Sequence, residues 1–385
     1  MKVIVLKREI NRIRSLSNSK EPLNLYGLIR ENENLCYVYS IGKKHPYLPL
    51  IGQLRKNCFL PDNLRLIGFL QEEGLAFYYK RYNNWQKTGY CLVDLKDSFA
   101  RTPFPDNLIA KLNKSCVVLF GLGSVGSRLA DGLVRSGICH LKLIDPDTVA
   151  IENISRHECD LYDLERLKVK AVKEKILRIN PLAKIDIFPF DVFQKDISVM
   201  EKVFQNVDLV IATTDRNAIQ LKVNYECFNR KIPALFAGCY EEARGGEVLF
   251  VLPGETKICL ECLRSGVKQP ERLGEIDYSN ALGPEDYRGE PGLNAAINLV
   301  TDVTQQYAIA LLLRKEKCEM AKLIDPEKNL LLVGGALGDG YYFFKRSFHF
   351  INPVIKGPWK GCGTCQNECV GISANKIDSK MQQIR

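Results

Sequence analysis

The chain has 385 residues, of which 46% are hydrophobic and 26% charged, which is enough apolar material for the cores of two domains. This composition excludes a largely disordered protein, and the uncharged apolar runs fall well short of the ~20 residues that a membrane-spanning helix needs. The formal net charge is +9, and most of it lies in residues 1–100, which hold 16 Lys and Arg against 9 Asp and Glu. The first apolar stretch spans only residues 3–6, too short for the core of a signal peptide, so we expect a cytoplasmic protein.

Residues 1–98 predict a small α/β module. A strand at 3–6 and a helix at 9–16 come first, followed by short segments rich in strand-forming residues at 25–29, 35–41, 64–70, 75–82 and 90–95. The segment that ends at 107 contains two prolines, and we interpret residues 99–107 as a linker. The basic balance of the module suits an acidic partner, although a solvated basic surface is the simpler explanation.

Beyond residue 108 the pattern changes to strands that alternate with helices. This alternation predicts a doubly wound, mostly parallel, Rossmann-like sheet across residues 108–368, followed by a loose tail at 369–385. A polar segment rich in Gly and Pro, residues 263–293, crosses between elements, and a long apolar helix follows it. The last strands are expected at 330–336 and 341–351.

A glycine-rich turn lies between the first buried strand of this region and its first helix, where residues 121–126 read GLGSVG. Gly121 permits a tight turn, Gly123 would let a phosphate approach the backbone, and Gly126 would let helix and strand pack closely. The helix N-terminus favours an anion, and Asp145 at the end of the second strand is placed to accept from ribose hydroxyls. The turn therefore predicts a nucleotide site, but a dehydrogenase would use the same parts.

Four further residues help to separate a dehydrogenase from other nucleotide-binding enzymes. They are Asn153, Arg156, Lys168 at the start of a helix, and Asp215 at the end of the fourth strand. Together with the glycine turn, this pattern over about residues 105–365 resembles the ThiF/MoeB family, the adenylyltransferases of sulfur-carrier and ubiquitin-like proteins. The resemblance implies ATP-dependent adenylation of a small protein's C-terminal carboxylate, which gives an acyl-adenylate and pyrophosphate. It also implies a homodimer.

That chemistry explains the residue types. A carboxylate and the α-phosphate of ATP are both anions, so the site needs fixed positive charge, Mg²⁺ and amide donors. Arg156 and Lys168 supply the positive charge, Asn153 supplies an amide, and Asp215 can hold Mg²⁺. The resemblance implies these same roles and places Asp145 on the ribose. A dehydrogenase would leave Asn153, Arg156 and Lys168 unexplained.

The sequence departs from the family pattern in two places. His157 stands where the best-known members have glutamine, and the spacing from Asn153 to Lys168 is one residue shorter than usual. Members often carry an N-terminal arginine that reaches a phosphate, commonly from the partner subunit. Arg101 is the candidate for that role here, and an ordinary linker arginine is the alternative.

Two Cys-x-x-Cys pairs, Cys259/Cys262 and Cys362/Cys365, stand out among the 14 cysteines. Four thiolates suit a closed, tetrahedral structural Zn²⁺ site, and the resemblance implies the same site. The alternative is four unligated thiols. Residues between Cys262 and Cys318 include no cysteine, so we expect the reaction to stop at the acyl-adenylate rather than pass to an enzyme thioester, with Cys318 as the remaining possibility.

The first module faintly resembles the JAB/MPN metalloprotease fold at residues 25–29 and 64–70. The place of that fold's His-x-His zinc motif is taken by Phe69, Leu70 and Gln71, which predicts a non-catalytic copy. A peptide-clamp domain, as in microcin-type enzymes that adenylate a ribosomal peptide, is the alternative. Three functions therefore compete: adenylation of a small ubiquitin-like or sulfur-carrier protein, the same chemistry on a ribosomal peptide, and a non-catalytic nucleotide-binding scaffold.

Overall fold

The computed structural model of the chain describes residues 1–15, 21–44, 48–56, 60–61, 63–71, 74–192, 197–266, 291–341, 343–353, 355, 357–358 and 361–366. The chain divides into two compact units, Met1–Pro103 and Phe104–Arg385. Among the described residues, no helix combines the length and the apolar character needed to cross a membrane. The predicted tail at 369–385 and most of the crossing segment lie outside the described residues.

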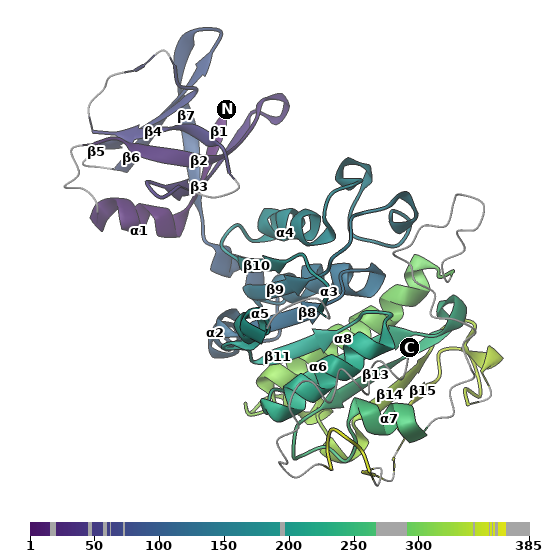
Figure 1. Cartoon of the computed structure of the whole chain (residues 1–385). Coiled ribbons are helices and arrows are strands. Elements are labelled where there is room, and N and C mark those ends of the chain that lie inside the picture. The colour runs from purple at the N-terminus through teal and green to yellow at the C-terminus, as the bar shows by residue number, and fades with distance from the viewer. Residues whose placement is uncertain are drawn as a thin grey trace. The chain divides into compact units, whose positions relative to one another are not determined.

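The first unit is a closed seven-stranded barrel in the order β1-β3-β2-β4-β5-β6-β7, with β7 paired to β1 (Figure 1). Its elements are β1 Lys2–Leu6, α1 Lys7–Ser15, β2 Leu23–Arg30, β3 Leu35–Ile41, β4 Leu50–Arg55, β5 Leu66–Gln71, β6 Gly74–Arg81 and β7 Asn84–Val93. Inward-facing residues such as Val5, Val38 and Phe77 are fully buried and form the barrel's core.

The barrel differs from the sequence prediction in two strands. Strand β7, predicted at 90–95, begins at Asn84. The prediction missed β4, whose sequence LIGQLR follows Pro49 and contains a glycine. Gly52 is required there, because a Cβ at that position would lie 2.0 Å from the Leu66 carbonyl oxygen of β5. The close approach of two strands, rather than side-chain alternation, specifies this segment.

The second unit is an eight-stranded sheet in the order β10-β9-β8-β11-β12-β13-β14-β15. Its strands are β8 Cys116–Phe120, β9 His140–Ile144, β10 Lys184–Phe188, β11 Leu209–Ala212, β12 Ala234–Cys239, β13 Gly245–Val251, β14 Leu330–Gly334 and β15 Phe350–Ile351. The first five pair in parallel and the last three are antiparallel. The parallel part has the strand order of dinucleotide-binding folds. The direction in which successive strands are added reverses between β8 and β11, and such folds bind their ligands at this switch point.

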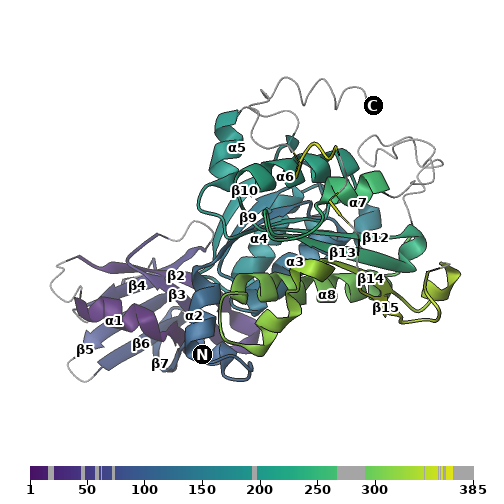
Figure 2. The same cartoon turned by 90° about the horizontal axis from the view of Figure 1, so that it is seen from below.

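Helices cover both faces of this sheet, as Figure 2 shows with α5, α6 and α7 on one side and α8 on the other. The helices are α2 Asp106–Lys114, α3 Ser124–Arg135, α4 Lys168–Ile179, α5 Ile197–Phe204, α6 Asn217–Asn229, α7 Leu260–Gly266 and α8 Asn294–Leu313. Two large apolar clusters result, one under α2, α3, α4 and α8 and the other under α5, α6 and α7. Every residue of β8 is buried, which is the pattern of a strand covered on both faces. The predicted α/β class and doubly wound sheet are confirmed.

The sequence prediction was wrong for four elements of this unit. Helix α2 begins directly after Pro105 and includes residues assigned to the linker, because Leu108, Ile109 and Leu112 give it a buried face. Helices α5 and α7 were also missed. The strand predicted at 341–351 is reduced to β15, since Phe348 has a φ of 54° and the rings of Tyr341, Phe343 and Phe344 pack on one another instead of alternating.

Candidate functional site

The glycine turn joins β8 to α3, and its three glycines have different surroundings. Gly121 has a φ of 86°, and a Cβ there would lie 2.8 Å from the Thr214 backbone nitrogen. A Cβ at Gly126 would lie 1.9 Å from the Gly121 carbonyl oxygen, so the helix and the turn pack too closely for any side chain. A Cβ at Gly123 would meet no atom within 4 Å. Packing therefore explains Gly121 and Gly126, whereas Gly123 borders open space that a ligand could occupy.

Helix α3 starts at this open space. Gly123 is its N-cap residue, no side chain caps its first turn, and that turn holds no acidic residue. The first backbone N–H groups of a helix have no partner within the helix, and they carry the positive end of the helix dipole. The end of α3 is therefore built to receive an anion such as a phosphate.

Asp145 follows β9 directly and fixes the glycine turn. Its carboxylate accepts hydrogen bonds from the backbone N–H of Leu122 at 2.6 Å and of Asp147 at 2.9 Å. The side chain is buried, and burial raises the pKa of Asp145 while the Lys168 charge and the two N–H donors oppose that rise. The carboxylate predicted to bind ribose thus also has a structural role in holding the turn.

Lys168 lies among three carboxylates. Its Nζ pairs with Asp147 Oδ2 at 2.8 Å, and it also interacts electrostatically with Asp145 and Asp215. Burial alone would lower the pKa of Lys168, but these carboxylates outweigh burial, so the pKa is raised and the ammonium stays charged at neutral pH. Because Asp145, Lys168 and Asp215 come from three different elements, the fold brings these predicted residues into one charged cluster.

Asn153 and Arg156 lie on the crossover between β9 and α4. The Asn153 side chain accepts from the Ala150 N–H at 3.0 Å, which closes a short helical turn. Arg156 is half-buried, and its charge reaches Cys239 at the end of β12. Burial raises the pKa of the Cys239 thiol to about 12 despite that charge, so the thiol is protonated at neutral pH and a poor nucleophile.

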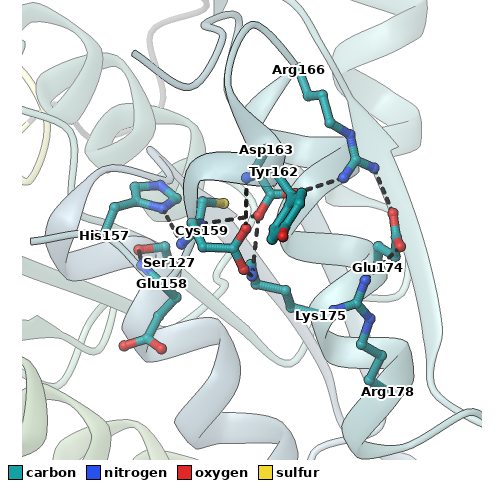
Figure 3. Close-up of polar contacts among 11 residues, drawn as sticks. Ser127, His157, Glu158, Cys159, Tyr162, Asp163, Arg166, Glu174, Lys175 and Arg178 are labelled. Carbon is teal, nitrogen blue, oxygen red and sulfur yellow. Dashed lines mark hydrogen bonds and ion pairs between the residues drawn. The ribbon is translucent and has the colours of Figure 1, made fainter. Parts of the chain in front are cut away.

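A network of ion pairs anchors the same crossover to α4 (Figure 3). The buried carboxylate of Asp163 accepts from Arg166 at 2.6 Å and from Lys175 at 3.1 Å. Lys175 also pairs with Asp160 at 2.7 Å, and Arg166 pairs with Glu174 at 2.5 Å. These contacts hold the end of the crossover that carries Asn153 and Arg156 against α4.

Arg101 is exposed and belongs to the first compact unit, whereas the glycine turn and the charged cluster belong to the second.

The four predicted cysteine ligands converge at a second place. Ligand atoms of Cys259, Cys262, Cys362 and Cys365 all lie within 4.8 Å of one another. The Sγ atoms of Cys259 and Cys262 are 3.8 Å apart, those of Cys259 and Cys362 are 3.5 Å apart, and those of Cys262 and Cys365 are 3.3 Å apart. A tetrahedral Zn²⁺ with Zn–S bonds of about 2.3 Å places its sulfurs about 3.8 Å apart. The set is therefore close to zinc geometry in both donor type and spacing.

Polar side chains join the two cysteine pairs around this cluster. The Glu261 carboxylate accepts from the Gly363 N–H at 3.1 Å and from the Thr364 hydroxyl at 2.6 Å. Asn224 on α6 accepts from the Leu260 N–H and donates to Thr364. Hydrogen bonds of this kind orient metal ligands, and they hold segments about 100 residues apart in the chain beside each other.

The sequence analysis assigned no role to two residues that contact the charged cluster or the glycine turn, Asp147 and His157. Asp147 pairs with Lys168, and His157 contacts the Leu122 carbonyl oxygen. A signal for Asp147 was present, since a second carboxylate directly after a Rossmann strand is available to a lysine on the next helix. Nothing in the sequence around His157 indicated a role for it, apart from its standing where the family has glutamine.

Residues 97–330 match the ThiF family, which is more than half of the chain. This chain belongs to the ThiF family. The predicted family membership is confirmed, and the match begins near the end of the first unit, so it does not extend to the barrel.

Curated relatives of this ThiF-family chain include activating enzymes. It is 30% identical over 161 residues to "Ubiquitin-like modifier-activating enzyme 5" of Drosophila erecta, covering 40% of each chain. It is 27% identical over 225 residues to "Molybdopterin-synthase adenylyltransferase" of Escherichia coli strain K12, covering 54% of this chain and 88% of the relative. The chain thus spans about two fifths of the length of the first group of relatives.

A solved structure shares the fold. The crystal structure of E. coli MccB with SeMet MccA superimposes with a TM-score of 0.52 at 17% identity, covering 71% of this chain and 76% of that one. MccB with ATP gives a TM-score of 0.50 at 19% identity, covering 68% and 69%. At this identity the likeness supports the α/β fold alone.

Proposed function

We propose that the second unit binds ATP and adenylates the C-terminal carboxylate of a small ubiquitin-like or sulfur-carrier protein. One observation carries the proposal: a charged lysine and three carboxylates lie at the switch point of the sheet, beside an uncapped helix N-terminus and the open space at Gly123. A dehydrogenase does not need a lysine and acidic cluster at this place. The family membership and the relatives named as activating enzymes and adenylyltransferases support the same chemistry.

The reaction joins two anions. A carboxylate oxygen of the substrate attacks the α-phosphorus of ATP, the bond from that phosphorus to the bridging oxygen breaks, and pyrophosphate leaves with the bond's electron pair. In this scheme the N–H groups of α3 and the space at Gly123 receive the phosphates, and Asp145 meets the ribose. Lys168 and Arg156 offset the charge that builds on the phosphate oxygens, and Asn153 donates from the crossover.

Metal binding completes the proposal. The oxygen-rich cluster fits Mg²⁺, with Asp215 as its protein ligand, and Mg²⁺ would neutralise charge on the departing pyrophosphate. The four cysteines fit Zn²⁺ in a structural role, which ties α7 to the segment at 361–366. Arg101 as a phosphate ligand, the homodimer and the cytoplasmic location stay predictions.

The first unit is proposed to recognise the substrate. Its positive balance suits an acidic carrier or leader. Whether the barrel is a non-catalytic JAB/MPN-like copy or a peptide clamp stays open, and the likeness to MccB with MccA keeps a ribosomal peptide as the second candidate substrate.

The test is ATP–pyrophosphate exchange with purified protein and the small proteins or peptides encoded near its gene. We expect exchange that depends on one of them and falls at least about a hundredfold in Arg156→Ala and Asp215→Ala. Arg178→Ala is the matched control, because Arg178 is exposed on α4 and pairs with Glu174 four residues away. Exchange that survives both site substitutions would show that these residues do not carry the chemistry, and ATP binding without exchange would favour the scaffold.

A further inference from the structure

His157 links the glycine turn to the crossover. Its Nε2 lies 2.6 Å from the Leu122 carbonyl oxygen, and its Nδ1 accepts from the Cys159 backbone N–H at 3.0 Å. Leu122 lies between Gly121 and Gly123, while His157 directly follows Arg156 in the chain. Figure 3 shows the imidazole turned toward the Cys159 backbone at the start of the ion-pair network.

These two partners determine the protonation state of the ring. A carbonyl oxygen can only accept, so Nε2 must carry a hydrogen, and a backbone N–H can only donate, so Nδ1 must carry a lone pair. His157 is therefore neutral with its hydrogen on Nε2. Burial and the facing charges of Lys168 and Lys175 outweigh Asp163 and the Leu122 hydrogen bond and lower the pKa of His157 to about 4, consistent with that state.

The peptide groups of Leu122 are consequently held from two sides. Asp145 accepts from its N–H at 2.6 Å, and His157 donates to its carbonyl at the same distance. The second of these peptide groups leads directly into Gly123, where the open space for a ligand begins. Each bond fixes one of the two peptide planes that flank Leu122. Together they set the direction in which the following N–H groups of α3 point.

We propose that His157 is a positioning residue, whose neutral imidazole orients the glycine turn toward the phosphates and keeps it in register with the crossover that carries Arg156. This inference rests on the proposed function. It also explains the family departure, since a glutamine amide likewise offers one N–H donor and one oxygen acceptor. A side chain without both groups leaves a buried carbonyl or N–H unpaired.

The test compares His157→Ala, His157→Gln and the control His140→Gln, whose histidine pairs with Asp186 on the edge strand β10. The dissociation constant of a non-hydrolysable ATP analogue is measured by calorimetry, together with kcat and KM for ATP in the exchange reaction. We expect His157→Ala to weaken binding at least about tenfold, with His157→Gln and His140→Gln within about threefold of the wild type. Thermal midpoints show whether the variants are folded.

A second measurement determines the protonation state of the His157 ring in the wild-type protein. The sequence has 4 histidines, so ¹⁵N spectra of the imidazoles are simple, and the His157 signals are identified by their loss in His157→Gln. The neutral form with hydrogen on Nε2 at pH 6 supports the proposal. A charged ring at pH 6, hydrogen on Nδ1, or equal analogue binding by wild type and a folded His157→Ala would overturn it. Wild-type protein that binds no ATP would instead refute the proposed function, and this inference with it.

Discussion

Two glycines of the same turn should respond in opposite ways to the addition of one methyl group. At Gly126 the new Cβ would lie 1.9 Å from the Gly121 carbonyl oxygen and 2.8 Å from Thr213 Oγ1. Neither α3 nor the turn can move without disturbing the buried core beneath them. At Gly123 the new Cβ would meet no atom within 4 Å, and the backbone φ of −73° accepts alanine.

The expected free energies follow from these surroundings. Overpacking against backbone costs roughly 1–3 kcal/mol, and alanine's better helix propensity recovers at most about 1 kcal/mol, so Gly126→Ala should lose roughly 1–2 kcal/mol of folding stability. In Gly123→Ala, the loss of a preferred N-cap residue and the reduced entropy of the unfolded chain nearly cancel, which leaves stability within about 0.5 kcal/mol. Its methyl group fills the space proposed for phosphate, so ATP affinity should fall at least about tenfold, or 1.4 kcal/mol.

The assay pairs denaturant unfolding with calorimetric titration of ATP for both variants and the wild type. Gly126→Ala should unfold at a lower denaturant concentration, whereas Gly123→Ala should keep the wild-type midpoint and lose nucleotide binding. Wild-type ATP affinity in Gly123→Ala would refute the phosphate site at this turn. Wild-type stability in Gly126→Ala would refute the close packing of α3 on the turn.

Two further predictions concern zinc and acid. The wild-type protein should contain about one zinc per chain by elemental analysis. Cys362→Ser should lose this zinc, and Cys318→Ser, which lies outside the cluster, should keep it. Wild-type protein without zinc would refute the zinc site. His157 has a pKa lowered from 6.5 to about 4, so as pH falls the unfolded chain takes up the proton first and the folded state loses stability between those values. The wild type should therefore lose up to about 3 kcal/mol more than His157→Gln across that window in denaturant unfolding, and equal losses would show that His157 is not held neutral.

The sequence predicted the elements of the second unit well where one physical signal was strong. Buried runs such as CVVLF and the spacing of Lys168 on its helix led to the α/β class and the Rossmann-like sheet, and the glycine turn predicted a nucleotide site. It failed where the determining contact was distant in the chain. Strand β4 depends on the close approach of β5 at Gly52, and the segment at 341–351 depends on packing among aromatic rings rather than on alternation.

The pattern from Gly121 to Asp215, with the two Cys-x-x-Cys pairs, indicated the family and predicted the residue types of the site, because those depend on residue identity and spacing along the chain. Only the tertiary structure brought the four sulfurs within 4.8 Å and placed three carboxylates around Lys168. It alone made His157 a neutral link between two loops, because hydrogen-bond partners 35 residues apart are chosen by the fold and not by the sequence around them.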